Sequence, residues 1–216
     1  MNFARGLCFA AVVFVVQSCA ETTAVFYPPP PPDPQTQMAA LESRIFELVQ
    51  DERHKIDPKA KALALDSELV GVARTHSQDM AAKSYLAHKS PTGTTSADII
   101  MDVDEKWQGL LGENLAAQHF NIGYAVDVDV FAHRFVESWL ASASHKENLS
   151  FEAYDRTGVG AAVSGDTIYV TELFATDLGL PPVQDNPKSR NVTEYPNAKA
   201  AKDAPPPKKV PRLPPE

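Results

Sequence analysis

The pattern of apolar and polar residues divides the middle of the chain into helical segments followed by strands. Apolar residues recur at helical spacing between Met38 and Lys55 and again after Asp66, which is a residue type that commonly caps helices. Asp127 or Asp129 is expected to cap a further helix. Its inner positions would be Val128, Phe131, Phe135 and Trp139. A shorter helix is expected from Ser96 to Met101.

The spacing changes in the last third of this region. Residues 158–163 and 167–174 are rich in residues that favour strands, and Ser164-Gly165-Asp166 between them is typical of a hairpin turn. Helices that precede and flank such strands predict an α+β domain in which helices pack on a sheet.

The start of the chain is typical of a bacterial export signal. Leu7–Val16 is almost wholly apolar, and it has the length of a signal-peptide core rather than of a membrane-spanning helix. Val16-Gln17-Ser18 before Cys19 resembles a lipoprotein processing site. We therefore expect a signal peptide at 1–18 and acylation of Cys19, which would anchor the protein in a lipid bilayer, with the outer membrane favoured. Ordinary cleavage, which would give a secreted or periplasmic protein, is the alternative.

Two proline-rich segments flank the domain. Residues 19–37 are expected to form an extended tether, and residues 181–216, which are poor in large apolar residues, a disordered tail. Residues 36–180 have 12 basic and 22 acidic side chains, a net charge of −10, whereas the tail has a net charge of +3. An acidic domain is a poor nucleic-acid binder, so nucleic acid is not an expected partner. The basic tail could contact an anionic envelope polymer or remain solvated.

Three short motifs give the most specific information. They are Tyr85-Leu86-Ala87-His88, Gly112-Glu113-Asn114-Leu115-Ala116, and Ser142-Ala143-Ser144-His145-Lys146-Glu147-Asn148-Leu149. In this order, and followed by Gly158-Val159-Gly160, they resemble the CAP superfamily, which is also called SCP-like. This superfamily includes cysteine-rich secretory proteins, venom antigens, pathogenesis-related proteins and bacterial secreted relatives. The resemblance covers roughly Met38 to Ala175 and implies a three-layer α-β-α sandwich. We expect the domain to occupy residues 38–180 and the protein to be a monomer.

The same resemblance implies a set of site residues. Many CAP proteins bring two histidines and two glutamates together in a cleft, and His88, Glu113 and His145 fall on three of these four positions. The fourth falls on Arg134, five residues before Trp139, with His133 and Glu137 as nearby substitutes. Two imidazoles and a carboxylate suit a divalent metal such as zinc. Arg134 would oppose a cation and could instead bind an anionic group of a ligand.

The sequence leaves three functions open. No His-Glu-x-x-His motif, Gly-x-Ser-x-Gly motif or phosphate-binding glycine loop is present in the chain, so no catalytic residues are assigned. We favour an envelope protein that binds a small amphiphilic ligand or a surface polymer in the cleft without turnover. The alternatives are a metal-dependent hydrolase that uses His88, Glu113 and His145, and a scaffold that acts through its proline-rich ends. His76, on an apolar helix stripe, is expected to be a hydrogen-bonded core residue.

Overall fold

The structure is a computed structural model that describes residues 29–178 and 193–194. The expected signal peptide, the acylated Cys19 and most of the tether and tail lie outside these residues. Within the tether, Pro34–Gln37 form a short 3-10 helix, not the extended conformation predicted there. The reason is local, because the Asp33 side chain accepts a hydrogen bond from the backbone nitrogen of Gln35 and caps this turn.

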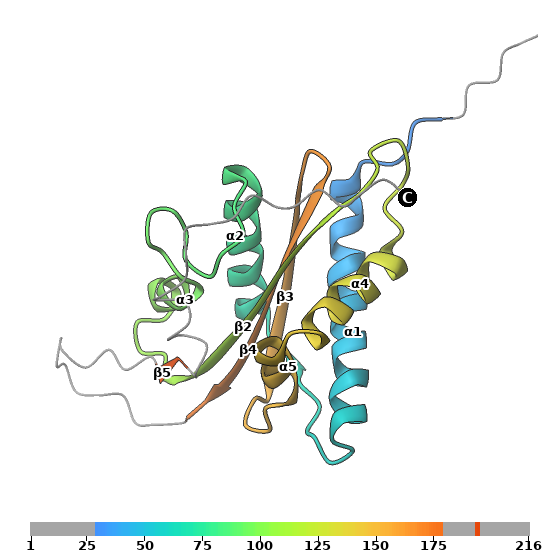
Figure 1. Cartoon of the computed structure of the whole chain (residues 1–216). Coiled ribbons are helices and arrows are strands. Elements are labelled where there is room, and N and C mark those ends of the chain that lie inside the picture. Colours follow the sequence, from blue (N-terminus) through green and yellow to red (C-terminus); the bar gives the residue numbers. More distant parts are fainter. Residues whose placement is uncertain (1–28, 179–192, 195–216) are drawn as a thin grey trace, which may run out of the picture. The chain divides into compact units, whose positions relative to one another are not determined.

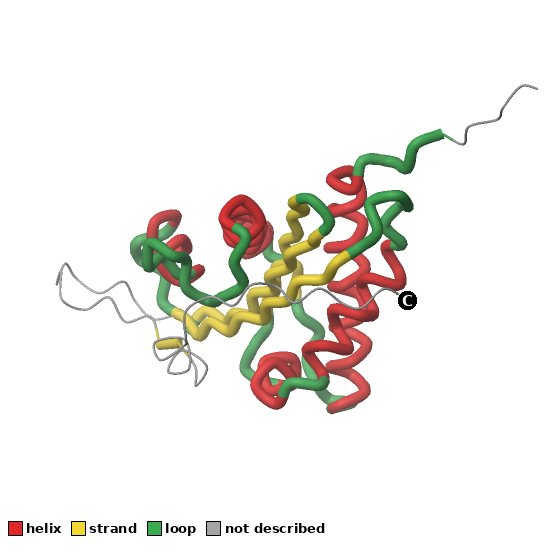
Figure 2. The backbone as a smooth tube through the Cα atoms, turned by 45° about the horizontal axis from the view of Figure 1, so that its top comes forward, coloured by secondary structure: helices red, strands yellow, loops and turns green. Residues whose placement is uncertain are grey.

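Helices cover both faces of one sheet, which confirms the predicted three-layer α-β-α architecture (Figures 1 and 2). Helices α1 (Met38–Ile56), α4 (Val128–Leu140) and α5 (Ala143–Ser150) pack on one face. Helices α2 (Ser67–Lys83) and α3 (Ser96–Val103) pack on the other. Among the described residues, no helix combines the length and the apolar character needed to cross a membrane.

The sheet has the strand order β1-β3-β4-β2-β5. Its three long strands are antiparallel neighbours, and a two-residue strand pairs in parallel at each edge. The strands are β1 (Ala64–Leu65), β2 (Gly109–His119), β3 (Arg156–Ser164), β4 (Thr167–Asp177) and β5 (Thr193–Glu194). The predicted hairpin joins β3 to β4, with Gly165 at a φ of 60°. The sequence did not predict β5, which lies inside the tail expected to be disordered.

Alternation along the strands divides the core into two sides. On β4, Val170 and Phe174 face α1 and α4, whereas Leu173 and Ala175 face α2 and α3. The predicted helix starts are confirmed, because the side chains of Asp66 and Asp127 cap α2 and α4. These caps fix where α2 and α4 begin above the sheet, which sets the positions of the side chains farther along them.

Side chains cover the sheet edges where the short strands β1 and β5 end. On β3, the Glu42 carboxylate accepts a hydrogen bond from the Ala161 nitrogen. On β2, the Asn148 side chain donates to the Glu113 carbonyl. Polar side chains thus satisfy backbone groups that could otherwise pair with another strand.

Candidate functional site

Glu113 is the centre of a buried polar cluster on the α2 side of the sheet. It follows Leu111 and precedes Leu115 on the same face of β2, so its side chain points toward α2 and α3. One carboxylate oxygen lies 2.9 Å from Nδ1 of His76 and accepts a hydrogen bond of 2.5 Å from the Ser96 hydroxyl. The other lies 2.6 Å from Nδ1 of His88. Three elements of the fold therefore converge on one carboxylate.

The electrostatics of this cluster favour an ionised Glu113. Burial by itself would raise the pKa of its carboxyl, but the charges and hydrogen bonds of His76 and His88 outweigh burial and lower the pKa well below its usual range. The pKa of the His76 imidazole is raised overall. Burial by itself would lower this pKa, but the Glu113 carboxylate and the Ala87 carbonyl together raise it by more than burial lowers it. Glu113 and His76 thus stabilise each other's charged forms.

His145 approaches the cluster from the other layer. It lies on α5, and its ring centroid is 6.4 Å from that of His88. Burial, followed by the electrostatic effect of the neighbouring His88 imidazole, lowers the pKa of the His145 imidazole to about 4, so His145 is neutral at pH 7. Its carbonyl accepts a hydrogen bond of 3.2 Å from the Asn114 side chain, which in turn accepts one from Asn148. These amides tie α5 to β2.

The glycine of the Gly-Glu-Asn element has a packing role. A Cβ atom at Gly112 would lie 2.5 Å from the Tyr154 hydroxyl and 2.9 Å from the Asn148 amide oxygen. A larger residue would therefore push α5 and the chain at Tyr154 away from β2. The glycine lets these segments approach the strand next to Glu113.

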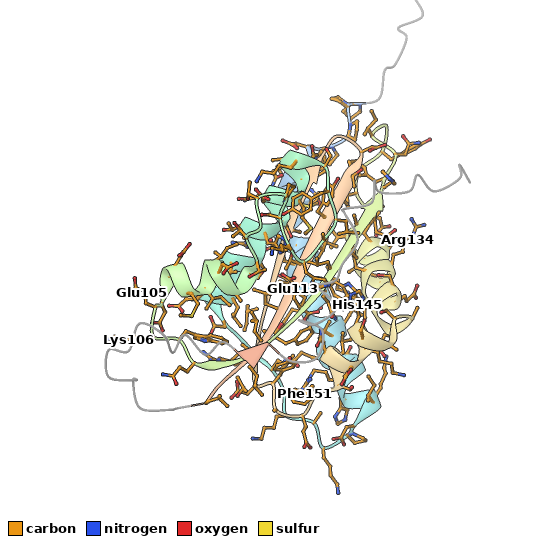
Figure 3. The ribbon with its side chains drawn as sticks, turned by 60° about the vertical axis from the view of Figure 1, so that its left-hand side comes forward. Glu105, Lys106, Glu113, Arg134, His145 and Phe151 are labelled. Carbon is orange, nitrogen blue, oxygen red and sulfur yellow. The ribbon has the colours of Figure 1, made fainter. Side chains whose placement is uncertain are left out.

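The structure brings together three of the four predicted site residues. Glu113 lies on β2 and His145 on α5, whereas Arg134 lies on α4 apart from both (Figure 3). His88 contacts the Glu113 carboxylate, and its ring lies beside that of His145. The Arg134 guanidinium carbon is 5.4 Å from the ring centroid of Phe131, one helical turn away. The substitute His133 is bonded through Nδ1 to the Asp129 carbonyl. The Arg134 side chain thus lies over a ring of its own helix, and its role as a fourth site residue stays a prediction.

Two partners of Glu113 were not predicted as site residues. His76 was expected only to be a hydrogen-bonded core residue, and it is 2 % exposed. Its partner, however, is the central carboxylate. Ser96 is 3 % exposed at the start of α3 and bonds the same oxygen as His76. The sequence signal for His76 was its place on the inner face of α2. Ser96 gave no signal beyond the expected start of a helix.

The geometry also bears on the predicted zinc ligands. Both oxygens of Glu113 are engaged with imidazole or hydroxyl groups, so this carboxylate is not free to be a direct ligand. Within residues 29–178 and 193–194, no three His, Cys, Asp or Glu side chains are grouped as metal ligands would be. The three-ligand zinc site therefore does not fit this arrangement. A carboxylate bonded to Nδ1 of a histidine is nevertheless the contact that orients many metal-binding imidazoles, and it does so for His88.

Comparison with known proteins gives one family and several bacterial relatives. A family model described as "CAP: Cysteine-rich secretory protein family" matches residues 51–176. The chain is 31% identical over 130 residues to the uncharacterized protein YkwD of Bacillus subtilis, covering 60% of this chain and 46% of the relative. The chain thus spans about half the length of that relative.

Two solved structures share the fold. An extracellular protein of Bacillus anthracis with an SCP domain is 33% identical, with a TM-score of 0.53. The match covers 69% of this chain and 45% of that one. An outer surface protein of Borrelia burgdorferi has the same TM-score at 22% identity, and the match covers 64% of this chain and 93% of that one. The second likeness concerns the fold alone.

Proposed function

The chain belongs to the CAP family of cysteine-rich secretory proteins, and from this premise we propose that it is an exported bacterial envelope protein that binds a ligand at His88 and His145 without turnover. The ligand class is a small amphiphilic molecule or a surface polymer. Membership of the family establishes the architecture but does not establish a chemical activity, so the proposal rests on the residues of the site.

The observation that carries the proposal is the saturation of Glu113. Its carboxylate is bonded to His76, His88 and Ser96 and has a lowered pKa. A general base must be able to take a proton near the working pH, and a carboxylate this strongly stabilised as an anion is a weak base. Glu113 instead fixes the ring of His88, whose side chain is 31% exposed. The neutral His145 beside it adds a second imidazole that can hydrogen-bond a ligand.

Export is supported by the sequence and by one relative, whereas anchoring is supported by the sequence alone. The Bacillus anthracis relative is described as extracellular. Residues 1–18 have the features of a signal peptide, and Cys19 follows a lipoprotein-like site. An acylated Cys19 would hold the domain at a membrane surface, and the outer membrane is the location that we favour.

Native mass spectrometry of the protein purified from a bacterial envelope tests the proposal. We expect a bound organic mass that is lost in His88→Ala and in His145→Ala and is kept in His133→Ala. His133 is a matched control because it is a half-exposed histidine on α4 bonded to the Asp129 carbonyl. A wild-type protein without any organic mass, in preparations from several growth conditions, would count against the proposal.

The metal-dependent hydrolase is the second candidate, and one contact favours it. The bond between Glu113 and Nδ1 of His88 is 2.6 Å long and orients the imidazole as in many metal sites. The same spectra decide between the two functions. One divalent cation per chain, lost in His88→Ala and His145→Ala and accompanied by hydrolysis of a peptide or wall fragment, would establish the hydrolase instead.

A further inference from the structure

A separate pocket lies between α2, the loop that follows it, and α3. Its volume is about 190 Å³, and His76 and Tyr85 form its buried part. Asp79, Thr75 and Thr94 line its polar side, and Ile99 of α3 lines its apolar side. His76 contacts Glu113, but neither Glu113, His88 nor His145 lines this pocket. The pocket is therefore a different place from the site proposed above.

Asp79 presents an ionised carboxylate to this pocket. It accepts a hydrogen bond of 2.8 Å from the Tyr85 hydroxyl and pairs with Lys83 at 2.5 Å. Burial would raise the pKa of Asp79, but these two partners lower it overall, while burial and Asp79 raise the pKa of Tyr85. A carboxylate has about four lone-pair positions, so Asp79 can accept further hydrogen bonds from a ligand. Lys83 already balances its charge.

The loop wall of the pocket is held in place by its own hydrogen bonds. The Ser90 nitrogen donates to the Thr94 carbonyl at 2.8 Å, and the Thr94 nitrogen donates to the Ser90 hydroxyl at 2.9 Å. Gly93 has a φ of 97°, which permits this tight turn. A bridge between Lys89 and Thr95 closes the loop. A wall that is already ordered costs little conformational entropy when a ligand binds.

Size and chemistry together define the ligand. Pockets for drug-sized molecules have volumes of roughly 300–1,000 Å³, so this pocket suits a smaller molecule. Ile99 and the Tyr85 ring offer apolar contact, while Asp79, Thr75 and Thr94 offer hydrogen-bonding groups. Because Lys83 balances the charge of Asp79, this wall of the pocket has no net charge with which to attract a charged ligand. An uncharged molecule with one apolar face and hydroxyl groups around its edge meets all three conditions.

We propose that this pocket is a second ligand site that takes one uncharged pyranose ring of a saccharide. The ring's C–H face lies on Ile99 and Tyr85, and its hydroxyl groups donate to Asp79 and bond to the threonine hydroxyls. This site does not depend on ligand binding at His88 and His145.

Titration of the full-length protein, labelled with nitrogen-15, with N-acetylglucosamine tests this proposal. We expect saturable shifts of the Thr75, Thr94 and Ile99 amide signals at roughly millimolar sugar, which is a usual affinity for so small a contact. The anionic probe glucuronate and the cationic probe glucosamine should bind about fivefold more weakly or worse. Absence of saturable shifts at these amides with the neutral sugar up to about 100 mM would overturn the proposal.

Two variants locate the bound sugar. Ile99→Trp fills the pocket and should abolish the shifts, whereas Val103→Trp, on the same helix at a position 63% exposed, should keep them. Asp79→Asn retains the shape and should weaken binding about tenfold, because hydrogen bonds to a charged acceptor are stronger than to a neutral one. The dispersion of the amide signals shows whether each variant is folded.

His88→Ala separates this proposal from the function proposed above. Loss of the sugar shifts in His88→Ala with retention in Ile99→Trp would place the sugar at the histidines and overturn the pocket assignment. The reverse result would support the pocket, whatever the mass spectra show for ligand binding at His88 and His145.

Discussion

Glu42 of α1 and Arg74 of α2 form an ion pair across the edge of β3, although their helices cover opposite faces of the sheet. Nε and Nη2 of the Arg74 guanidinium both donate to the Glu42 carboxylate, which also accepts a hydrogen bond of 2.9 Å from the Ala161 nitrogen. The Glu42 side chain is 8% exposed and that of Arg74 46% exposed. Glu42 therefore links both helical layers to the strand between them.

Replacement of Glu42 should cost more stability than replacement of its partner. In Glu42→Ala the buried Ala161 N–H loses its acceptor, and a buried unsatisfied group of this kind costs about 1–3 kcal/mol. In Arg74→Ala that hydrogen bond remains, and only a partly exposed ion pair is lost, so the cost should be about 1 kcal/mol or less. Urea unfolding of both variants measures the difference. A larger loss in Arg74→Ala would contradict the central role of Glu42.

Gly160 is expected to tolerate no side chain, because α2 lies directly on it. A Cβ atom there would lie 2.1 Å from the Arg74 nitrogen and 2.2 Å from the Ala73 carbonyl carbon, both of which are backbone atoms. Gly160→Ala should therefore lower the free energy of unfolding by about 3 kcal/mol or prevent folding, as overpacking against a rigid neighbour does.

Gly71→Ala is the matched control for that change. Gly71 lies in α2, and an added Cβ atom there meets nothing within 4 Å. This variant should gain about 0.5–1 kcal/mol, because alanine loses less conformational entropy than glycine in a helix. Thermal unfolding of the two variants checks whether Gly160→Ala lowers stability and Gly71→Ala raises it. Equal tolerance of alanine at both positions would show that α2 can move away from β3.

Glu172 should make the protein less stable as the pH rises. Its burial raises the pKa to about 8, although a hydrogen bond from Thr157 and the charge on Arg53 partly oppose this. The unfolded chain has a carboxyl pKa of about 4.3, so between these two values the folded state binds the proton more tightly. Stability is therefore greatest below the unfolded pKa and falls until the pH passes about 8.

The variant Glu172→Gln isolates this contribution, because it cannot ionise and has nearly the same shape. From pH 5 to pH 8, the unfolding free energy of the wild type should fall relative to that of the variant. Urea unfolding at four or more pH values measures that difference. A difference that stays constant over this range would show that Glu172 ionises in the fold as it does in the unfolded chain.

Glu113→Gln tests the carboxylate at the centre of the site. The amide keeps the shape but removes the charge that favours the protonated His76, so we expect a loss of about 3 kcal/mol, as for other broken buried pairs. It should also weaken ligand binding, because the amide has one acceptor oxygen in place of the two that His76, Ser96 and His88 share, so the His88 ring is held less firmly. Urea unfolding and native mass spectrometry measure the two effects. Glu137→Gln, at an exposed position of α4, should change neither.

Local sequence signals predicted most elements of the fold but only part of the site. The caps Asp66 and Asp127 and the turn at Gly165 act on residues next to them, so the sequence alone reveals them. Helix α5 has only two buried residues, Asn148 and Leu149, so it left no apolar stripe from which to predict a helix.

The partners of Glu113 depend on tertiary packing. Ser96 and His76 lie 17 and 37 residues from it in the sequence, and no short-range pattern connects them. The resemblance to the CAP family named His88 and His145 as site residues with Glu113, and in the structure His88 contacts Glu113 while the His145 ring lies beside that of His88. It also suggested a role for Arg134, whose side chain lies over the Phe131 ring of its own helix, and that role stays a prediction.

The meeting of His88 and His145 has a mechanical consequence. Among the described residues, the outer side of β2 pairs with another strand only at Leu110 and Leu111, and the two histidines come from opposite layers beyond that point. A molecule bonded to both imidazoles would connect the two helical layers at a point where no strand pairs with the outer side of β2. Ligand binding would then increase the force needed to pull the two layers of the domain apart.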